Sequence, residues 1–220
     1  MLVLALACVL YLLALGKTPL RIEAEKRCHA IVEGMLTSGD YLMPRLPGKW
    51  FEPERVERVN KPPLFYWLSA LSCRLHGAMD LFWFRLPSAL AALGTLALVL
   101  TWGREMKSPA VGLVAAVLLG LMYVFVVEAR RGTFEMLLTL LSGWAVLSSY
   151  RLTQRPGWPL ALLATLLFGL GFLTKATPVL LLVPLPLLAW IVATRRSAIL
   201  KDYRLWTLLL VGLGIGISWH

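Results

Sequence analysis

Apolar runs of membrane-spanning length dominate this sequence and limit what it can fold into. Of its 220 residues, 59% are hydrophobic and 15% are charged, and the mean hydropathy is +0.73. Soluble domains are about 45–50% apolar and about 25% charged. A hydrocarbon layer about 30 Å thick needs roughly 20 apolar residues per helix. We therefore predict an all-α polytopic membrane protein with seven spans, at residues 2–16, 81–103, 110–128, 134–150, 158–174, 176–194 and 205–219.

The basic residues of the short loops predict how these spans are oriented. They gather in three alternate loops, and cytoplasmic loops carry the excess of Lys and Arg. The N-terminus is then cytoplasmic, and residues 17–80 lie on the outer face. The first span has no basic region before it and no small-residue cleavage site before Lys17, so we interpret it as a retained span. The net charge of +10 thus sets topology, and nucleic acid is not an expected partner. The basic loop residues are Arg104, Lys107, Arg151, Arg155, Arg195, Arg196, Lys201 and Arg204.

The chain accordingly divides into a first transmembrane helix at 1–16, an outer loop at 17–80 and a bundle of about six helices at 81–220. Residues 63–77 are apolar but short for a span, and a crossing there would invert every later loop. We predict an interfacial helix with Phe65, Tyr66 and Trp67 at headgroup depth. Apolar residues at helical spacing predict another surface helix after Ile22, which stops at Gly39.

Acidic and basic side chains converge on the outer face from separate segments. Glu23 and Glu25 follow the first span, Glu135 opens a later one, and Lys61 and Lys175 lie next to apolar runs. A carboxylate can deprotonate an acceptor hydroxyl or amine, while Lys and Arg can neutralise a departing phosphate. The alternative is that these are solvated loop charges, helix-start residues and headgroup anchors. Charge placement alone leaves both interpretations open.

Metal ligands are not evident in the sequence. The three histidines are scattered, and the three cysteines show no metal-ligand spacing. No motif demands a metal or another cofactor, and dependence on a divalent metal stays open.

The order of short motifs along the chain resembles a known family. These motifs are Glu25-x-Arg27, Met35-Leu-x-Ser-Gly-Asp40, Pro44-Arg-Leu, Lys61-Pro-Pro-Leu-x-Tyr-Trp67, Arg85-Leu-Pro-Ser and Gly171-Phe-Leu-Thr-Lys175. The pattern resembles the N-terminal half of bacterial lipid-linked-sugar glycosyltransferases of GT-C fold, the family that contains the lipid A aminoarabinose transferases and is related to protein O-mannosyltransferases. The resemblance implies a GT-C-type helix bundle with periplasmic surface helices, in the bacterial inner membrane. Relatives carry further spans and a soluble C-terminal domain, so we expect this chain to be part of a longer enzyme.

The resemblance also implies roles for individual residues. The family's first outer loop usually carries Asp-Glu-x-Arg-Tyr, and here its glutamate and arginine fall on Glu25 and Arg27. Its aspartate falls on Ala24 and its tyrosine on Cys28, so the sequence departs from the family at the expected base. For the base that activates the acceptor, Glu25 is the first choice and Glu23 the second, and Glu135 matches the family's second acidic position. The implied phosphate-binding residues are Lys61, Lys175, Arg27 and Arg131.

The implied activity is inverting transfer of a sugar from a polyprenyl-phosphate carrier to a lipid, glycan or protein acceptor on the periplasmic face. The alternative is a non-catalytic protein that binds polyprenyl lipid, such as a flippase or transporter. Transporters place polar groups and broken helices near the membrane midplane. The spans of this chain are nearly free of charge at mid-depth, which favours chemistry at the surface.

Overall fold

The computed structural model describes residues 2–42, 61–195 and 202–217, and the chain forms two compact units, Met1–Leu137 and Leu138–His220. The described residues form helices and connecting turns, which confirms the predicted all-α class. The units divide the chain at a different place from the segments 1–16, 17–80 and 81–220, which were drawn by membrane topology. Several predicted features lie outside the described residues: the Pro44-Arg-Leu motif, Arg196, Lys201 and residues 218–219.

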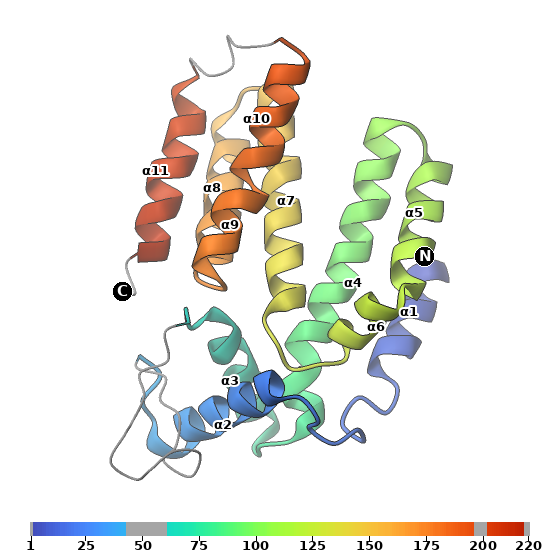
Figure 1. The fold of residues 1–220 in the computed structure, drawn as a ribbon, viewed down its shortest axis with the longest axis vertical. Helices are drawn as coiled ribbons and strands as arrows, with labels where there is room; N and C mark the ends of the chain where they lie inside the picture. Colours follow the sequence, from blue (N-terminus) through green and yellow to red (C-terminus); the bar gives the residue numbers. More distant parts are fainter. Residues whose placement is uncertain (1, 43–60, 196–201, 218–220) are drawn as a thin grey trace. The chain divides into compact units, whose positions relative to one another are not determined.

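The first unit is built around a long helix, α4, with two helices along its side and two across its N-terminal end (Figure 1). Helices α1 and α5 pack against α4, and the short α6 follows α5. Helices α2 and α3 pack on each other, and α3 packs on α4. The bounds are α1 Leu2–Leu12, α2 Glu23–Ser38, α3 Leu64–His76, α4 Leu81–Met106, α5 Pro109–Leu121 and α6 Tyr123–Ala129.

Local signals in the sequence set the ends of α2, α3 and α4. Gly39 caps α2 in the left-handed region at φ 74°, and its N–H donates to the carbonyl of Met35. Pro63 is the N-cap of α3, directly after Pro62. The Asp80 side chain accepts a hydrogen bond from the N–H of Phe82 at the start of α4. The predicted helices after Ile22 and over 63–77, and the stop at Gly39, are confirmed.

The second unit packs apolar helix faces on one another. Its helices are α7 Glu135–Gln154, which begins at the end of the first unit, α8 Trp158–Phe172, α9 Ala176–Leu182, α10 Pro184–Ala193 and α11 Tyr203–Ile217. Its core contains Phe168 of α8, Ala145 of α7 and Val179 of α9. Helices α8 and α11 lie side by side (Figure 1). The helix breaks between α9 and α10 just before Pro184, because a proline has no backbone N–H to continue the hydrogen bonding of the preceding turn.

Among the residues that the structure describes, two stretches of helix are able by length and composition to cross a membrane on their own, α4 and the 176–193 stretch. Helices α5 and α6 would make a third as one span, although the chain bends by 71° between them, and α1 and α8 are shorter apolar helices. The number of seven spans stays a prediction.

Two predicted spans, 2–16 and 110–128, differ from the structure toward their C-terminal ends. The predicted span over 110–128 is not one straight helix, because Met122 adopts an extended conformation that ends α5. The Tyr11 hydroxyl donates to the carbonyl of Gly120 at 2.9 Å, which satisfies an oxygen that a continuing helix would have bonded. The first span is helical only to Leu12, whereas the prediction extended it to residue 16.

Candidate functional site

The polar centre of the first unit is a buried ion pair between Arg85 of α4 and Glu25 of α2. The Arg85 Nε donates to the Glu25 Oε1 at 2.7 Å, and the Arg85 Nη2 donates to Oε2 at 3.3 Å. The two side chains are only 2% and 3% exposed. Because taking both charges out of water is costly, such a pair is retained only where geometry and further hydrogen bonds satisfy it.

Further hydrogen bonds extend this pair to two other segments of the chain. The Arg85 Nη1 donates to the carbonyl of Leu15 and to both oxygens of Thr18, each at 2.8 Å. The backbone N–H of Gly132 donates to the Glu25 Oε1, also at 2.8 Å. Four segments therefore meet at one carboxylate and one guanidinium: the end of the first span, α2, α4 and the 130–134 turn.

The 130–134 turn approaches α4 very closely. A Cβ on Gly132 would lie 2.1 Å from the Cε1 of Phe84, a ring that is fully buried. The Ser88 hydroxyl donates to the Thr133 carbonyl at 2.9 Å and holds the same turn. Only a residue without a side chain lets the Gly132 amide reach Glu25.

Three of the predicted site residues influence the Cys28 thiol on the buried face of α2 electrostatically. Burial raises the pKa of Cys28 to about 12. The charge of Lys61 and a hydrogen bond with Tyr66 lower this pKa but are smaller effects than burial. The charges of Glu25 and Glu135 raise it further. The charges of Lys61, Glu25 and Glu135 thus all act on this thiol, although Cys28 itself stays protonated at neutral pH.

Lys61 lies over an aromatic ring that begins the next segment. Its Nζ is 4.5 Å from the centre of the Phe134 ring, within the range of a cation–π contact. The Phe134 ring packs edge-on against Phe65 of α3, with ring centres 6.4 Å apart. Lys61 itself is exposed, whereas the aromatic ring that its ammonium group contacts is buried.

The remaining predicted residues have different surroundings. Glu23 is exposed and accepts from the Lys26 Nζ at 2.7 Å, and Arg27 is exposed on the same helix. Arg131 is half-buried and donates to Glu128 at 2.7 Å. Lys175 is the N-cap of α9 in the second unit, so its predicted place beside Lys61 stays a prediction.

Sequence reasoning did not assign a role to Arg85 or Gly132. Arg85 was noted only as part of a motif, although a charge inside a predicted span is costly unless it is paired. That cost was a usable signal, and it pointed to a carboxylate partner on the outer face. Gly132 gave no such signal, because its role depends on the distance between two segments far apart in the sequence.

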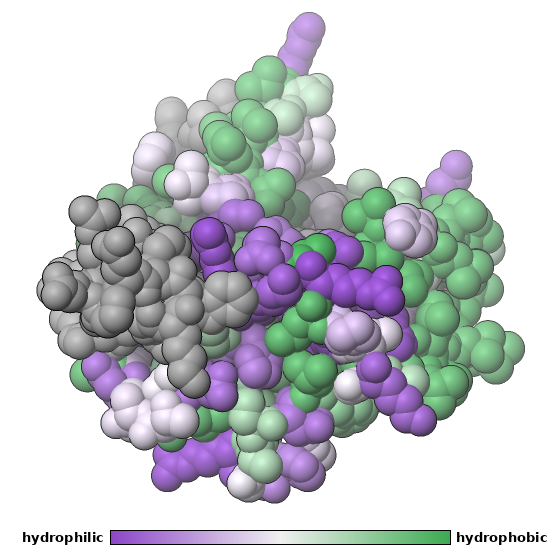
Figure 2. Space-filling model, turned by 60° about the horizontal axis from the view of Figure 1, so that its bottom comes forward, coloured by the Kyte–Doolittle hydropathy of each residue, from purple (hydrophilic) through white to green (hydrophobic). Residues whose placement is uncertain are grey.

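The surface of this end of the molecule is polar. Figure 2 brings forward the end at which α2 and α3 lie in Figure 1, and hydrophilic side chains gather across it. Within residues 2–42, 61–195 and 202–217, no group of three or more His, Cys, Asp or Glu side chains is placed to hold a metal ion. The site thus combines the buried Glu25–Arg85 ion pair, the exposed Lys61 and further carboxylates.

This fold and its polar end define a multi-pass membrane protein of the GT-C type. Residues 60–219 match the family model described as dolichyl-phosphate-mannose-protein mannosyltransferase, and the chain belongs to that family. The predicted family resemblance is thereby confirmed.

Curated relatives carry the name undecaprenyl phosphate-alpha-4-amino-4-deoxy-L-arabinose arabinosyl transferase. The protein from Aeromonas salmonicida is 32% identical over 188 residues, which are 79% of this chain and 32% of that protein. A second such transferase, from Pseudomonas fluorescens, is 32% identical over 197 residues, covering 84% of this chain and 33% of its own length. The chain spans about a third of the length of these relatives.

Solved structures of ArnT from Cupriavidus metallidurans share the fold. The apo structure superposes with a TM-score of 0.78 at 22% identity, and covers 99% of this chain and 40% of that protein. The structure bound to undecaprenyl phosphate gives a TM-score of 0.75 with the same identity and coverage.

Proposed function

We propose that the protein to which this chain belongs transfers a sugar from a polyprenyl-phosphate carrier to a lipid, glycan or protein acceptor. The observation that carries this proposal is the 32% identity, over about four fifths of the chain, to transferases named for an undecaprenyl-phosphate-linked sugar. The reaction inverts the anomeric carbon and takes place at the periplasmic face of the bacterial inner membrane, with the N-terminus of the chain in the cytoplasm.

The donor side of the site is cationic in this proposal. When the sugar leaves, negative charge develops on the carrier phosphate, and fixed cations stabilise that charge. Lys61 is suited to this role, because its ammonium group contacts the Phe134 ring while the residue remains exposed. Arg131 lies three residues from Phe134, and Arg27 and Lys175 are the further cations that we assign to the phosphate.

The acceptor side requires a carboxylate that reaches the acceptor's proton. Both oxygens of Glu25 already accept hydrogen bonds from Arg85 or Gly132, so this ion pair has to open before Glu25 acts as a base. A catalytic role of Glu25 stays a prediction, and it requires this opening. Glu135 is half-buried at the start of α7, directly after Phe134, and we assign the base role to it first. Glu23, which is exposed on α2, is the alternative.

The test is transfer of radiolabelled sugar from a polyprenyl-phosphate-linked pool, in membranes that contain either this chain or its complete reading frame. We expect Glu135→Gln to lower transfer by about a hundredfold or more, the usual worth of a general base. Lys61→Met should lower it by at least about tenfold, while Lys17→Met, an exposed lysine after the first span, should not.

Other outcomes separate the competing interpretations. If Glu23→Gln, Glu25→Gln and Glu135→Gln each keep full transfer, carboxylate assistance is wrong. If neither protein transfers sugar but both bind the carrier, the non-catalytic interpretation replaces this one. No motif demands a metal or another cofactor, and the same assay tests metal dependence: activity that survives EDTA would exclude it, and loss of activity that Mg²⁺ or Mn²⁺ restores would establish it.

The proposed orientation has its own test. A cysteine at position 38, on the exposed end of α2, should react with a membrane-impermeant maleimide added to intact spheroplasts. Labelling of Ser38→Cys only after the membrane is opened would place this face in the cytoplasm and contradict the proposal.

A further inference from the structure

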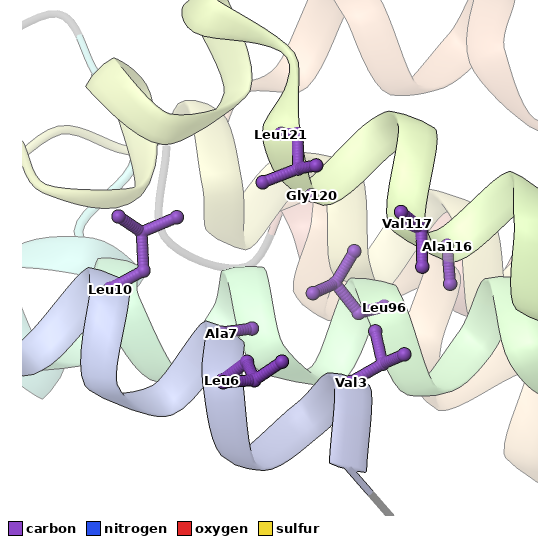
Figure 3. Close-up of a pocket in the computed structure, with 9 residues that line it drawn as sticks. All are labelled: Val3, Leu6, Ala7, Leu10, Leu96, Ala116, Val117, Gly120 and Leu121. Carbon is purple, nitrogen blue, oxygen red and sulfur yellow. The ribbon is translucent and has the colours of Figure 1, made fainter.

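An apolar pocket of about 310 Å³ lies between α1, α4 and α5 in the first unit. Side chains of α1 and α5 point toward one another across it, and Leu96 of α4 forms its floor (Figure 3). The lining residues Val3 and Leu10 mark its two ends along α1, and seven residues of helix make it about 10 Å long. Other residues of the same flank are exposed and apolar, including Val9 and Leu13 of the first span and Leu118 of α5.

One end of this pocket carries a positive charge. The Arg130 Nη1 donates to the carbonyl of Leu10 at 2.6 Å and to that of Tyr11 at 3.2 Å. Leu10 also lines the pocket, and the Tyr11 hydroxyl binds the carbonyl of Gly120, another lining residue. The guanidinium is therefore fixed at the end of the pocket where α1 ends.

The bend between α5 and α6 lies at the same end. Leu121 lines the pocket, and the following residues Met122 and Tyr123 are 57% and 80% exposed. Because α6 turns away by 71°, α5 does not continue past the guanidinium as a straight helix would. The pocket is thus lined by apolar residues and has the Arg130 guanidinium at one end.

We propose that this pocket binds an acyl chain of an anionic glycerophospholipid, with its phosphate on Arg130. The match is one of chemistry, because a molecule with one anionic end and an apolar chain satisfies the guanidinium and the lining side chains together. Of the phosphate amphiphiles, phospholipid is the one that the surrounding bilayer supplies in bulk. This site is separate from Lys61 and does not depend on sugar transfer.

The test measures how much phosphatidylglycerol the purified 220-residue chain retains, by native mass spectrometry from detergent micelles. Leu6→Trp fills the pocket from its exposed side and should lower retention at least about tenfold, since the loss of two buried methylenes already suffices. The matched control is Val9→Trp on the same helix, which is also exposed but does not line the pocket, and it should retain the lipid.

The phosphate contact is tested separately. Arg130→Gln should weaken phosphatidylglycerol binding about fivefold and leave diacylglycerol unchanged, because one basic residue at a membrane surface contributes about 1 kcal/mol. Arg130→Lys should recover most of the binding even if loss of the α1 contact loosens the helix in the Gln variant. Arg104→Gln, at the far end of α4, should have no effect.

Several results would overturn the proposal. Equal retention in Leu6→Trp and Val9→Trp would remove the pocket as the site, and equal retention of diacylglycerol and phosphatidylglycerol by the unaltered chain would remove the phosphate contact. Displacement of phosphatidylglycerol by an equal concentration of undecaprenyl phosphate would assign the pocket to the carrier. Lipid-free elution of the chain as a dimer that Leu6→Trp breaks would assign it to a second copy.

Discussion

Glu25 and Glu23 stand two residues apart on α2, yet the buried and exposed faces of this helix give them opposite environments. Glu25 is on the face that carries Cys28, Val32 and Met35, and its carboxylate is enclosed with Arg85. The Glu23 side chain is 63% exposed and contacts Lys26, one turn away on the same helix. One glutamate joins four segments, whereas the other makes a local surface pair.

We interpret this difference as a division of roles, in which Glu25 holds the site together and an exposed carboxylate such as Glu23 is free to take part in chemistry. A carboxylate enclosed by an arginine and a backbone amide fixes positions, and its removal affects the whole first unit. A carboxylate at the surface contributes little to stability but can meet a substrate. Substitutions on the two faces should therefore change the free energy of unfolding by different amounts, which chemical denaturation of the chain in micelles measures.

The largest effect is expected from Arg85→Met. It leaves the Glu25 carboxylate buried without its cation, which costs about 3–5 kcal/mol when one partner of a buried pair is removed. The double variant Arg85→Met with Glu25→Leu removes both charges and should recover much of that loss. A single variant that loses less than about 1 kcal/mol would mean that the buried pair is not a structural tie.

Gly132→Ala should be the next most disruptive change. The new Cβ would meet the buried Phe84 ring at 2.1 Å, and overpacking of this kind costs about 1–3 kcal/mol. Gly157→Ala is a loop control, since its nearest neighbour would be 3.9 Å away. Equal stability of the two variants would show that the 130–134 turn has room to move away from α4.

His29 predicts a smaller, pH-dependent effect on the same helix. Burial lowers its pKa from 6.5, opposed by Glu33 and Glu25 and reinforced by Arg85. Because the unfolded chain then binds a proton that the folded chain does not, stability should fall as the pH drops through 6.5, by at most about 1.4 kcal/mol per unit. His29→Gln should remove this slope, and an unchanged slope in that variant would assign it to other groups.

The smallest effect is expected on the exposed face. Lys26→Ala breaks the surface pair with Glu23, and exposed pairs three residues apart on a helix contribute about 0.2–0.5 kcal/mol. Added salt should erase even this difference. A loss above about 1 kcal/mol would mean that the exposed face of α2 is also structural.

Features set by neighbouring residues were predictable from the sequence, and features set by distant ones were not. Gly39 and Pro63 end and begin helices through their own backbone preferences, so α2 and α3 followed from local pattern. The family motifs likewise put Lys61 and Glu135 in one site; both charges act on the Cys28 thiol, and their shared site stays a prediction.

The break at Met122 and the Glu25–Arg85 pair required the third dimension. The 110–128 segment is apolar up to Glu128 and has no proline at its bend, where Tyr11, more than a hundred residues earlier, binds the Gly120 carbonyl. Glu25 and Glu23 both looked like first-turn acids of a surface helix, and only the position of Arg85 distinguishes them. Sequence reasoning therefore ranked Glu25 before Glu23 as the base, without the information that Glu25 is enclosed with Arg85.

The most direct test of this account compares two double-mutant cycles on unfolding free energy, Glu25→Gln with Arg85→Met, and Glu23→Gln with Lys26→Ala. The account predicts a coupling of about 2 kcal/mol or more for the buried pair and less than about 0.5 kcal/mol for the exposed one. Equal couplings would contradict the division of α2 into a face that holds the site and a face that is available to substrate.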